Sequence, residues 1–448
     1  MKMHNNSPQR SNREHIQLTT GLENLWIGEI SHSHRERFRG KRLGLLANPA
    51  SVDRSFRHAS SLINRLYPDQ LKALFSPQHG FHAEKQDNMI ESDHTVDPIL
   101  KIPIFSLYSA TRIPTKEMFD LVDTLIVDIQ DAGTRVYTFI YTISYCLEAA
   151  ARYGKEVVIL DRPNPIGGVA VEGNILKNEY SSFVGRFPIP MRHGLTVGEI
   201  ASLFNSKFIT EKNGDRKKGI SAKRLPVLEN RCDLTVIPMT GWKRDMLFSD
   251  TGLPWIPPSP NLPSPTSALV YPGQVIWEGT NISEGRGTTQ PFEIFGAPFI
   301  NTEKILDSLC SYINQDAGLS IFRMDKSGAT SIPGLILRPI VFEPTSGKWQ
   351  GKVCQGFQIH VIDPELFKPY TTSLLLLQQI IKHHPDQFRW KEPPYEYEYE
   401  KLPIDLILGD KMLRYAIENL ENIDVIEESW QIEINEFKQM SRAFYLYE

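Results

Sequence analysis

The segment TLIVDIQDAGTRVYTFIYT, residues 124–142, passes within a few positions from apolar side chains to side chains that can do chemistry. The polar group consists of Asp128, Gln130, Asp131, Arg135 and Tyr137. Carboxyl groups can exchange protons with a ligand, a guanidinium can bind an anion through two parallel hydrogen bonds, and a phenol can donate a hydrogen bond. The pattern predicts a ligand site.

An Asp at the end of a strand can also cap the next helix. We expect that helix to begin near Thr134, which makes Asp131 a capping candidate and Asp128 the better functional one.

Polar clusters follow two other apolar runs. LKALFSP is followed by Gln78 and His79, and KEVVILD by Arg162 and Asn164. Glu172 lies further along in VAVEGN, where a carboxyl group among apolar residues needs a reason, either catalysis or an ion pair with an arginine such as Arg162 or Arg192. Three clusters at corresponding places predict one shared site.

Short apolar strands alternate with longer amphipathic segments from residue 41 onward. Strands that are apolar throughout, alternating with helices, predict a mainly parallel sheet covered on both faces, and therefore a Rossmann-like α/β domain over residues 21–252. The longest predicted helix, VYTFIYTISYCLEAAARYG, ends at Gly154. In such sheets ligands bind beyond the carboxyl ends of the strands, which is where the polar clusters fall.

The second half has a different character. Proline density peaks in residues 255–273, where regular periodicity stops, and residues 276–299 form a Gly-rich loop. After about residue 300 helices and strands resume, which predicts a smaller α+β domain over residues 253–448, with the active cleft between the two domains. The polar residues 1–20 are expected to be a disordered tail.

Composition narrows the class of protein. The net charge is -4 and the pI is near 6.3, so no basic field supports nucleic-acid binding. The four cysteines form no C-x-x-C pair and are expected to be free thiols in a reducing compartment. No secretory signal and no membrane-spanning stretch are recognisable, so we expect a cytoplasmic protein. The sequence does not predict an oligomeric state.

Several segments resemble a bacterial family of exo-acting β-N-acetylmuramidases, formerly a family of unknown function. The matching segments, in family order, are FSPQHGF, DIQDAGTRVYT, LDRPNPIGG, VEG, PIPMRHGLTVGEIA, SPNLPSPTSALVYPG, EGTNISEGRGTTQPFE and GAPF. The resemblance implies a Rossmann-like N-terminal domain, a smaller C-terminal domain and a cleft between them. It also implies release of N-acetylmuramic acid from non-reducing ends of peptidoglycan fragments, without a cofactor.

The chain departs from that family at one position. Many relatives have Pro-Glu-His-Gly where this chain has Gln78 before His79, and an amide cannot exchange a proton at neutral pH. An acid or base role is therefore not carried over to Gln78. The resemblance makes Glu91 the counterpart of a later family glutamate, with Glu84 and Asp87 as alternatives.

Glycoside hydrolysis needs a protonated acid beside the leaving oxygen and a second group on the opposite sugar face. The second group is a nucleophile about 5 Å away or a base roughly 6.5–9.5 Å away. With a 2-acetamido sugar, the substrate's own amide can be the nucleophile while a carboxylate orients it. We expect Glu91 as acid/base and Glu172 as second carboxylate, with Asp128 and Asp131 suited to the orienting role.

The remaining candidates are expected to bind substrate. Arg135 and Arg192 suit the lactyl carboxylate of muramic acid. Asn261 is the polar member of the proline-rich cleft edge, and the Gly-rich loop is expected to supply a cleft wall. The full predicted substrate-binding set is Gln78, His79, Gln130, Arg135, Tyr137, Arg162, Asn164, Arg192, His193, Asn261, Asn281, Glu284 and Arg286.

The sequence also has features that bear on three other classes of protein. His79, His82, Asp93 and His94 could suggest a metal, but their spacing matches no known ligand pattern, and no metal is expected. A nucleotide-dependent enzyme would need a phosphate-binding Gly-rich motif, and neither G-x-G-x-x-G after the first strand nor a Walker motif is present. A muropeptide-binding protein without turnover stays open because of Gln78.

Overall fold

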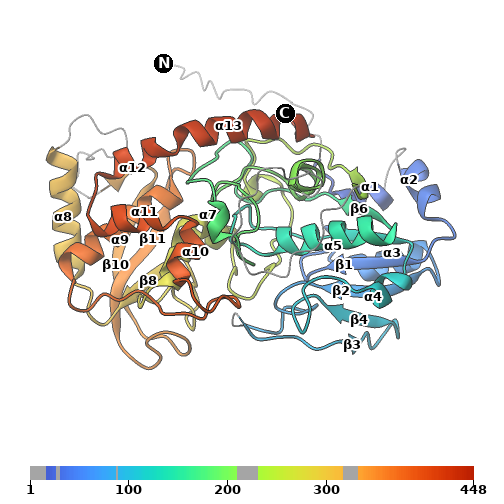
Figure 1. Ribbon diagram of the computed structural model, residues 1–448, viewed down its shortest axis with the longest axis horizontal. Coiled ribbons are helices and arrows are strands. Elements are labelled where there is room, and N and C mark those ends of the chain that lie inside the picture. Colours follow the sequence, from blue (N-terminus) through green and yellow to red (C-terminus); the bar gives the residue numbers. More distant parts are fainter. Residues whose placement is uncertain (1–16, 27–30, 87–88, 209–230, 316–330) are drawn as a thin grey trace, which may run out of the picture.

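The computed structural model describes residues 17–26, 31–86, 89–208, 231–315 and 331–448. In this part of the chain, seven strands of the first half form one sheet in the order β3-β4-β2-β1-β5-β6-β7, parallel except for β3 (Figure 1). The strands are β1 Leu43–Ala47, β2 Leu71–Ser76, β3 Thr95–Val96, β4 Pro103–Ser106, β5 Thr124–Asp128, β6 Glu156–Leu160 and β7 Asp233–Ile237. The helices of this half are α1 Gly21–Trp26, α2 Ser31–Phe38, α3 Ala59–Leu66, α4 Lys116–Asp120, α5 Phe139–Tyr153 and α6 Val197–Leu203.

Strand β5 shows why these apolar runs become central strands. Its five residues are all buried, and alternate side chains point to opposite faces of the sheet. Leu125 and Val127 join the core that includes α4 and α5, whereas Ile126 joins the core that includes α1 and α3. Helices therefore cover both faces, and the predicted Rossmann-like α/β architecture is confirmed.

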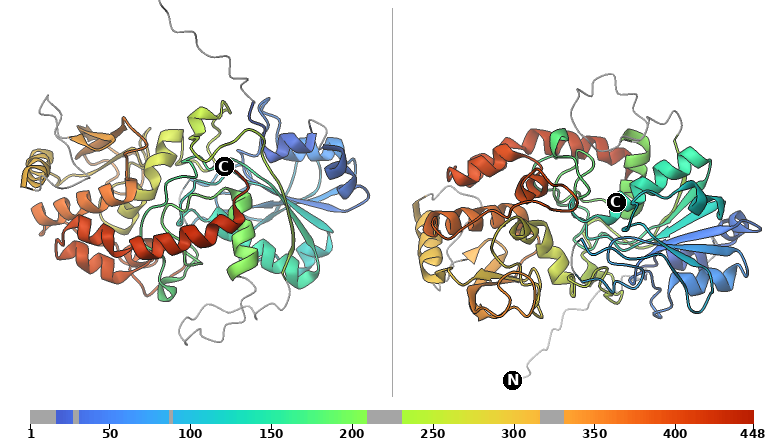
Figure 2. Two further views of the ribbon diagram at one scale, coloured as in Figure 1. Left: turned by 90° about the horizontal axis from the view of Figure 1, so that it is seen from above. Right: turned by 60° about the horizontal axis from the view of Figure 1, so that its bottom comes forward.

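The second half contains a smaller antiparallel sheet in the order β8-β11-β10-β9, packed with helices (Figure 2). Its strands are β8 Ile294–Ala297, β9 Ser331–Ile332, β10 Leu335–Phe342 and β11 Cys354–Val361. Its helices are α7 Pro265–Gln274, α8 Thr302–Gln315, α9 Pro369–His383, α10 Pro403–Leu408, α11 Lys411–Glu418, α12 Ile423–Ser429 and α13 Gln431–Ser441. Helix α7 lies inside the proline-rich segment that was expected to be irregular. Ser264 caps it and Pro265 occupies its first turn, where a missing N–H costs nothing.

Helix α5 ends as predicted and begins later than predicted. Gly154 closes it with φ 63°, a left-handed conformation that glycine adopts without strain. The helix begins at Phe139 and not near Thr134, because the main chain is still engaged elsewhere. The N–H of Arg135 donates to the carbonyl of Met191 at 2.7 Å. Asp131 therefore does not cap this helix.

Two buried charged side chains join the halves. Arg135 donates to the carbonyls of Ile407 at 3.1 Å and Leu408 at 2.8 Å, at the C-terminal end of α10, where the helix dipole favours a cation. Glu172 accepts a 2.9 Å hydrogen bond from the N–H of Thr371, in the first turn of α9. The C-terminal end returns to the first half, where the hydroxyl of Tyr447 donates to Asp161 at 2.6 Å.

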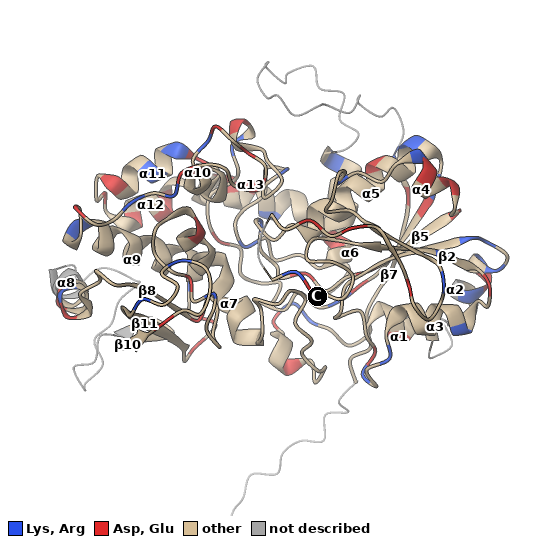
Figure 3. Cartoon of the chain, turned by 90° about the horizontal axis from the view of Figure 1, so that it is seen from below, with Lys and Arg blue, Asp and Glu red and all other residues tan. Residues whose placement is uncertain are grey.

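Basic and acidic residues are interspersed along the chain in both halves (Figure 3). No helix among the described residues is long and apolar enough to span a lipid bilayer. Residues 1–16 of the expected disordered tail lie outside the described part. Residues 18–20 are ordered, because Leu18 packs against Met239 and Trp242 while Thr19 pairs with Thr240.

Candidate active site

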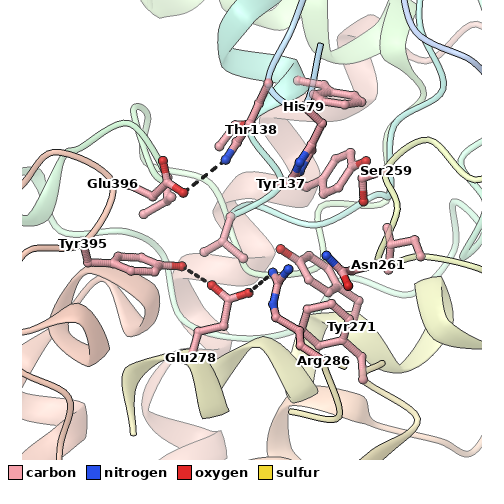
Figure 4. Close-up of a pocket in the computed structure, with 16 residues that line it drawn as sticks. His79, Tyr137, Thr138, Ser259, Asn261, Tyr271, Glu278, Arg286, Tyr395 and Glu396 are labelled. Carbon is pink, nitrogen blue, oxygen red and sulfur yellow. Dashed lines mark hydrogen bonds and ion pairs between the residues drawn. The ribbon is translucent and has the colours of Figure 1, made fainter. Parts of the chain in front are cut away.

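A pocket lies between the two halves and is lined by side chains of both (Figure 4). The first half supplies the loop after β2 and the start of α5. The second half supplies α7, the Gly-rich loop and a turn near residue 396. The lining residues are Gln78, His79, Val136, Tyr137, Thr138, Phe139, Val184, Ser259, Asn261, Leu262, Tyr271, Glu278, Arg286, Phe292, Tyr395 and Glu396.

Glu278 is held as an ionised carboxylate would be. Arg286 donates to its Oε1 at 2.7 Å, and the hydroxyl of Tyr395 donates to its Oε2 at 2.7 Å (Figure 4). Arg286 lies between two acids, since its Nε is also 3.2 Å from Glu284, which pairs in turn with Lys348 at 2.8 Å. The guanidinium is thus neutralised by its neighbours, and Glu278 has a donor at each oxygen.

Glu396 occupies a different environment. Burial raises the pKa of its carboxyl above the usual range, and the nearby charge of Glu278 adds to this effect. The hydroxyl of Tyr108 donates to Oε2 at 2.6 Å and Nε2 of Gln78 donates to Oε1 at 3.1 Å; both bonds oppose the rise. The carboxyl group whose pKa is raised therefore lies in the same pocket as the carboxyl group that Arg286 and Tyr395 bind.

A strained turn carries Glu396. The main chains of Tyr395 and Glu398 exchange hydrogen bonds of 2.9 and 3.0 Å, and the two central residues, Glu396 and Tyr397, have φ angles of 46° and 67°. Such tight turns favour Asn-Gly, because residues with a Cβ are strained at positive φ. Backbone strain of this kind is concentrated at functional sites, and His79 and Phe292 in the same pocket also have positive φ.

His79 is a neutral group in this pocket. Burial lowers its pKa to about 4. Its Nδ1 lies 2.7 Å from the carbonyl of Lys85, so Nδ1 carries the proton and Nε2 is left as an acceptor. His79 can orient a hydroxyl group, and it does not supply charge. Among the described residues, no group of three or more His, Cys, Asp or Glu side chains could hold a metal ion.

Five residues of the predicted site line this pocket: Gln78, His79, Tyr137, Asn261 and Arg286. Asn261 donates to the carbonyl of Gln86 at 2.8 Å and so ties the proline-rich segment to the loop after β2. Glu284 lies behind Arg286. Asn281 bonds the main chain of Gln387 and Arg389 and is not a lining residue.

Asp128 and Arg162 form a buried ion pair with contacts of 2.5 and 2.8 Å. They lie at the carboxyl edge of the sheet where the strand order reverses, the place where Rossmann-like proteins bind nucleotides. A cavity of about 20 Å³ remains there, lined by Arg162 and Gln130 and closed by Phe248, Leu253, Pro254 and Ile256. The chain itself thus fills the crevice that a nucleotide would need.

Asp131, Asn164 and His193 stabilise neighbouring turns. Asp131 accepts from the N–H of Gly133 at 2.7 Å, and its other oxygen, Oδ1, has no partner among the described residues. Nε2 of His193 is 3.7 Å from Asp131. Asn164 donates to the carbonyl of Leu195 at 3.0 Å. These side chains are buried, and none lines the pocket.

Glu172, Arg192 and Glu91 also lie away from the pocket lining. Glu172 bonds α9, and Arg192 donates to the carbonyl of Ile166. Glu91 is exposed and accepts a 3.2 Å hydrogen bond from the hydroxyl of Tyr397. The structure therefore does not bring Glu91, Asp128 and Glu172 together. Glu84 lies next to Gly80 and not among the lining residues, and Asp87 falls outside the described residues.

The sequence interpretation missed Glu278, Tyr395 and Glu396. Glu278 opens the segment EGTNISEGRGTTQPFE, which had been singled out for its later residues. The other two lie in EPPYEYEYEK, residues 392–401, which was interpreted as an aromatic-rich loop or edge strand. A glutamate flanked by tyrosines was the available signal, because buried tyrosine hydroxyls need acceptors.

A two-domain α/β protein with two carboxyl groups in contrasting environments, in a pocket between its halves, has the chemistry of a glycoside hydrolase. The chain belongs to the family described as exo-beta-N-acetylmuramidase NamZ: the N-terminal domain matches residues 43–266 and the C-terminal domain residues 269–447. The predicted family, and with it the class of peptidoglycan glycosidase, is confirmed.

One relative is the peptidoglycan beta-N-acetylmuramidase NamZ of Bacillus subtilis (strain 168). It is 37% identical over 421 residues, which cover 94% of this chain and 90% of that protein. Two crystal structures of DUF1343 family proteins from Bacteroides fragilis NCTC 9343 share the fold. BF0371 has a TM-score of 0.79 at 31% identity and covers 97% of this chain and 100% of its own. BF0379 has a TM-score of 0.70 at 26% identity and covers 96% of this chain and 99% of its own.

Proposed function

We propose that this chain is an exo-β-N-acetylmuramidase in which Glu396 is the general acid and Glu278 the second carboxylate. It releases N-acetylmuramic acid from the non-reducing end of peptidoglycan fragments. The observation that carries the proposal is the contrast between the two carboxyl groups of one pocket: burial favours the protonated form of Glu396, while Arg286 and Tyr395 hold Glu278 as a carboxylate.

In this mechanism Glu396 gives its proton to the glycosidic oxygen as the bond to the anomeric carbon breaks. Positive charge develops on the sugar ring, and Glu278 stabilises it, as a nucleophile, as the base for water, or by orienting the substrate's acetamido group. Arg286 and Tyr395 fix the position of Glu278, so little reorganisation is needed when charge develops. We expect His79 and Asn261 to form hydrogen bonds with sugar hydroxyl groups.

Substrate entry requires movement at the pocket. The cavity has a volume of about 30 Å³, room for about two water molecules, which is less than a pyranose ring needs. The turn Tyr395–Glu398 contacts the first half through side chains, Glu396 with Gln78 and Tyr108, and Tyr397 with Glu91. These are contacts that a sugar can replace without breaking main-chain hydrogen bonds.

The test is product identification. The protein is incubated with a disaccharide that has N-acetylmuramic acid at its non-reducing end, and NMR follows the released sugar and its first anomer. We expect free N-acetylmuramic acid, and no release from the disaccharide of reversed order. The first anomer shows whether Glu278 acts by retention or inversion.

A second function, that of a muropeptide-binding protein without turnover, is favoured by Gln78. The family resemblance implies a glutamate at this position, and the amide of Gln78 cannot exchange a proton in its place. Saturable binding of the disaccharide with no sugar released after prolonged incubation would establish that function and overturn the first.

A cytoplasmic location, where the enzyme would act on imported or recycled fragments, is part of the proposal. Cys146, Cys232 and Cys354 are buried free thiols, as is typical of a reducing compartment. Cell fractionation tests this, and recovery of the protein from the envelope or the medium would contradict it.

A further inference from the structure

The substrate of the proposed reaction is an anion, because muramic acid carries a lactyl carboxylate. A pocket that selects it needs a cation that no protein carboxylate already neutralises. The two arginines expected from the sequence do not line the pocket: Arg135 donates to carbonyls of α10 and Arg192 to the carbonyl of Ile166, and each retains a buried Nε without a partner among the described residues. Arg286 lines the pocket but contacts both Glu278 and Glu284.

Arg112, between β4 and α4, is in a different situation. Its guanidinium carbon lies 3.6 Å from the ring centroid of Tyr397, 5.2 Å from that of Tyr108 and 5.3 Å from that of Phe183. Its Nε and Nη2 are buried and donate to no atom of the described residues. Buried donors without partners are costly, and such exceptions in native proteins call for an explanation. The rings fix the plane of the guanidinium without using its hydrogen-bonding capacity.

This stacked guanidinium is next to the catalytic acid. Tyr397 follows Glu396 in the strained turn, and the hydroxyl of Tyr108 donates to Glu396. The positive charge of Arg112 also acts to lower the pKa of the Glu396 carboxyl. Phe183 precedes Val184, which lines the pocket. Arg112 does not itself line the pocket, but three aromatic contacts hold its unsatisfied donors next to Glu396 and Val184, which do.

We propose that Arg112 binds the carboxylate of the sugar's lactyl substituent and makes the pocket select muramyl over N-acetylglucosaminyl residues. This assignment rests on the proposed function and names the group that confers its specificity. An anion on the peptide stem of a muropeptide has the same chemistry, so the experiment must separate the two sources.

The test compares four chromogenic β-glycosides: N-acetylmuramide, its lactyl methyl ester, its lactyl amide with L-alanine, and N-acetylglucosaminide. Charged hydrogen bonds of this type predict that the wild type prefers the free acid over the ester by about 10- to 100-fold in kcat/KM. Arg112→Gln should remove that preference, because kcat/KM should fall much more for the free acid than for the ester. If the alanine amide is as good a substrate as the free acid and also loses activity in the variant, the stem carboxylate is the ligand and the lactyl assignment is overturned.

Two controls keep the inference separate from turnover and folding. Arg65 also lies over a ring, 5.5 Å from the centroid of Trp26, and is exposed far from the pocket, so Arg65→Ala should keep the preference. Calorimetric titration with free N-acetylmuramic acid and with N-acetylglucosamine is done on the Glu396→Gln variant and on the Glu396→Gln/Arg112→Gln double variant. It measures the selectivity of binding in the absence of catalysis. Selective binding that depends on Arg112 supports the inference even if no turnover occurs. An equal loss for acid and ester, or an unchanged preference, overturns it.

Discussion

Nε2 of Gln78 donates a 3.1 Å hydrogen bond to Oε1 of Glu396, across 318 positions of the chain. The amide is itself oriented, because Oε1 of Gln78 accepts from the hydroxyl of Thr138 at 2.7 Å. An amide can support a carboxyl group without competing for its proton. Gln78 therefore supports another acid in this chain.

Replacing Gln78 by Glu should shift the activity of the enzyme to higher pH. The substitution removes a donor that stabilises the Glu396 carboxylate and adds a negative charge, and both changes raise the pKa of Glu396. Activity requires protonated Glu396 and is lost as pH rises through this pKa. The basic limb of the kcat/KM profile should therefore move upward by about one pH unit.

Gln78→Met separates the two effects, because it removes the donor without adding charge and should give a smaller shift in the same direction. A large gain in kcat for Gln78→Glu with no shift of the basic limb would show that position 78 supplies the acid, against the assignment to Glu396.

Glu396→Gln should lower kcat for an unactivated disaccharide by about 10²- to 10⁴-fold, the usual contribution of general acid catalysis. An aryl glycoside with a good leaving group should lose much less, because its oxygen departs without a proton. Glu400→Gln, an exposed residue of the same loop, is the matched control and should behave as wild type. Equal losses for both substrates would mean that Glu396 is not the proton donor.

The architecture could be predicted from sequence because it depends on local patterns. Runs such as Leu43–Ala47 are apolar throughout. This pattern is typical of a strand whose two faces are both buried. The rule that ligands bind beyond strand ends also brought Gln78, His79 and Tyr137 to the pocket. The same rule selected Asp128 and Arg162, which satisfy each other instead. The strand-end rule predicts where a side chain lies, but it does not predict which group the side chain binds.

The missing half of the site depends on contacts between distant segments. Glu396 reaches Gln78 only because a tight turn holds two residues at positive φ, and the Glu-Tyr pair gives none of the Asn-Gly signal of such turns. Its burial follows from the packing of the two halves, which no local pattern encodes. Glu172 was selected for its apolar setting and Arg135 as a partner for the lactyl carboxylate. In the structure both side chains bind helix ends of the other half.

Glu278→Gln should lower kcat by about a thousandfold or more for activated and unactivated substrates alike, because charge development on the sugar is common to both. This uniform loss distinguishes it from Glu396→Gln. Glu284→Gln is the control, since it removes the other acid that contacts Arg286. If both variants lose activity equally, the effect acts through Arg286, and Glu278 has no direct part in the reaction.

Glu172→Gln should change the pH dependence of stability. Burial raises the pKa of Glu172 to about 7, so between about pH 4.5 and 7 the native state binds more protons than the unfolded state. The stability contribution of this group is present at low pH and is lost as pH rises through 7. A neutral glutamine avoids that loss and should stabilise the protein at pH 8 by roughly 1–3 kcal/mol, with little effect at pH 5.

Urea unfolding at the two pH values measures this difference. Glu156→Gln is a control of opposite sign, because ion-pairing and hydrogen-bonding partners that include Lys41 and Thr124 lower the pKa of Glu156 against the effect of burial. A fully folded Glu172→Gln enzyme without turnover would instead return Glu172 to the catalytic role that the sequence suggested.

Arg135→Ala should destabilise the protein without changing its choice of sugar. The guanidinium donates to four carbonyls, those of Asn174, Ile189, Ile407 and Leu408. Its removal takes a buried donor from each of them, and other donors still reach Leu408, from Nδ2 of Asn174, and Ile189, from the N–H of Leu176. The expected loss is at least about 3 kcal/mol in the free energy of unfolding, measured by denaturant titration. Where the variant is still folded, the ratio of kcat/KM for N-acetylmuramide to that for N-acetylglucosaminide should equal the wild-type ratio. A selective loss for the muramide would mean that Arg135 binds the lactyl carboxylate after all, and the role assigned to Arg112 would then have to be given up.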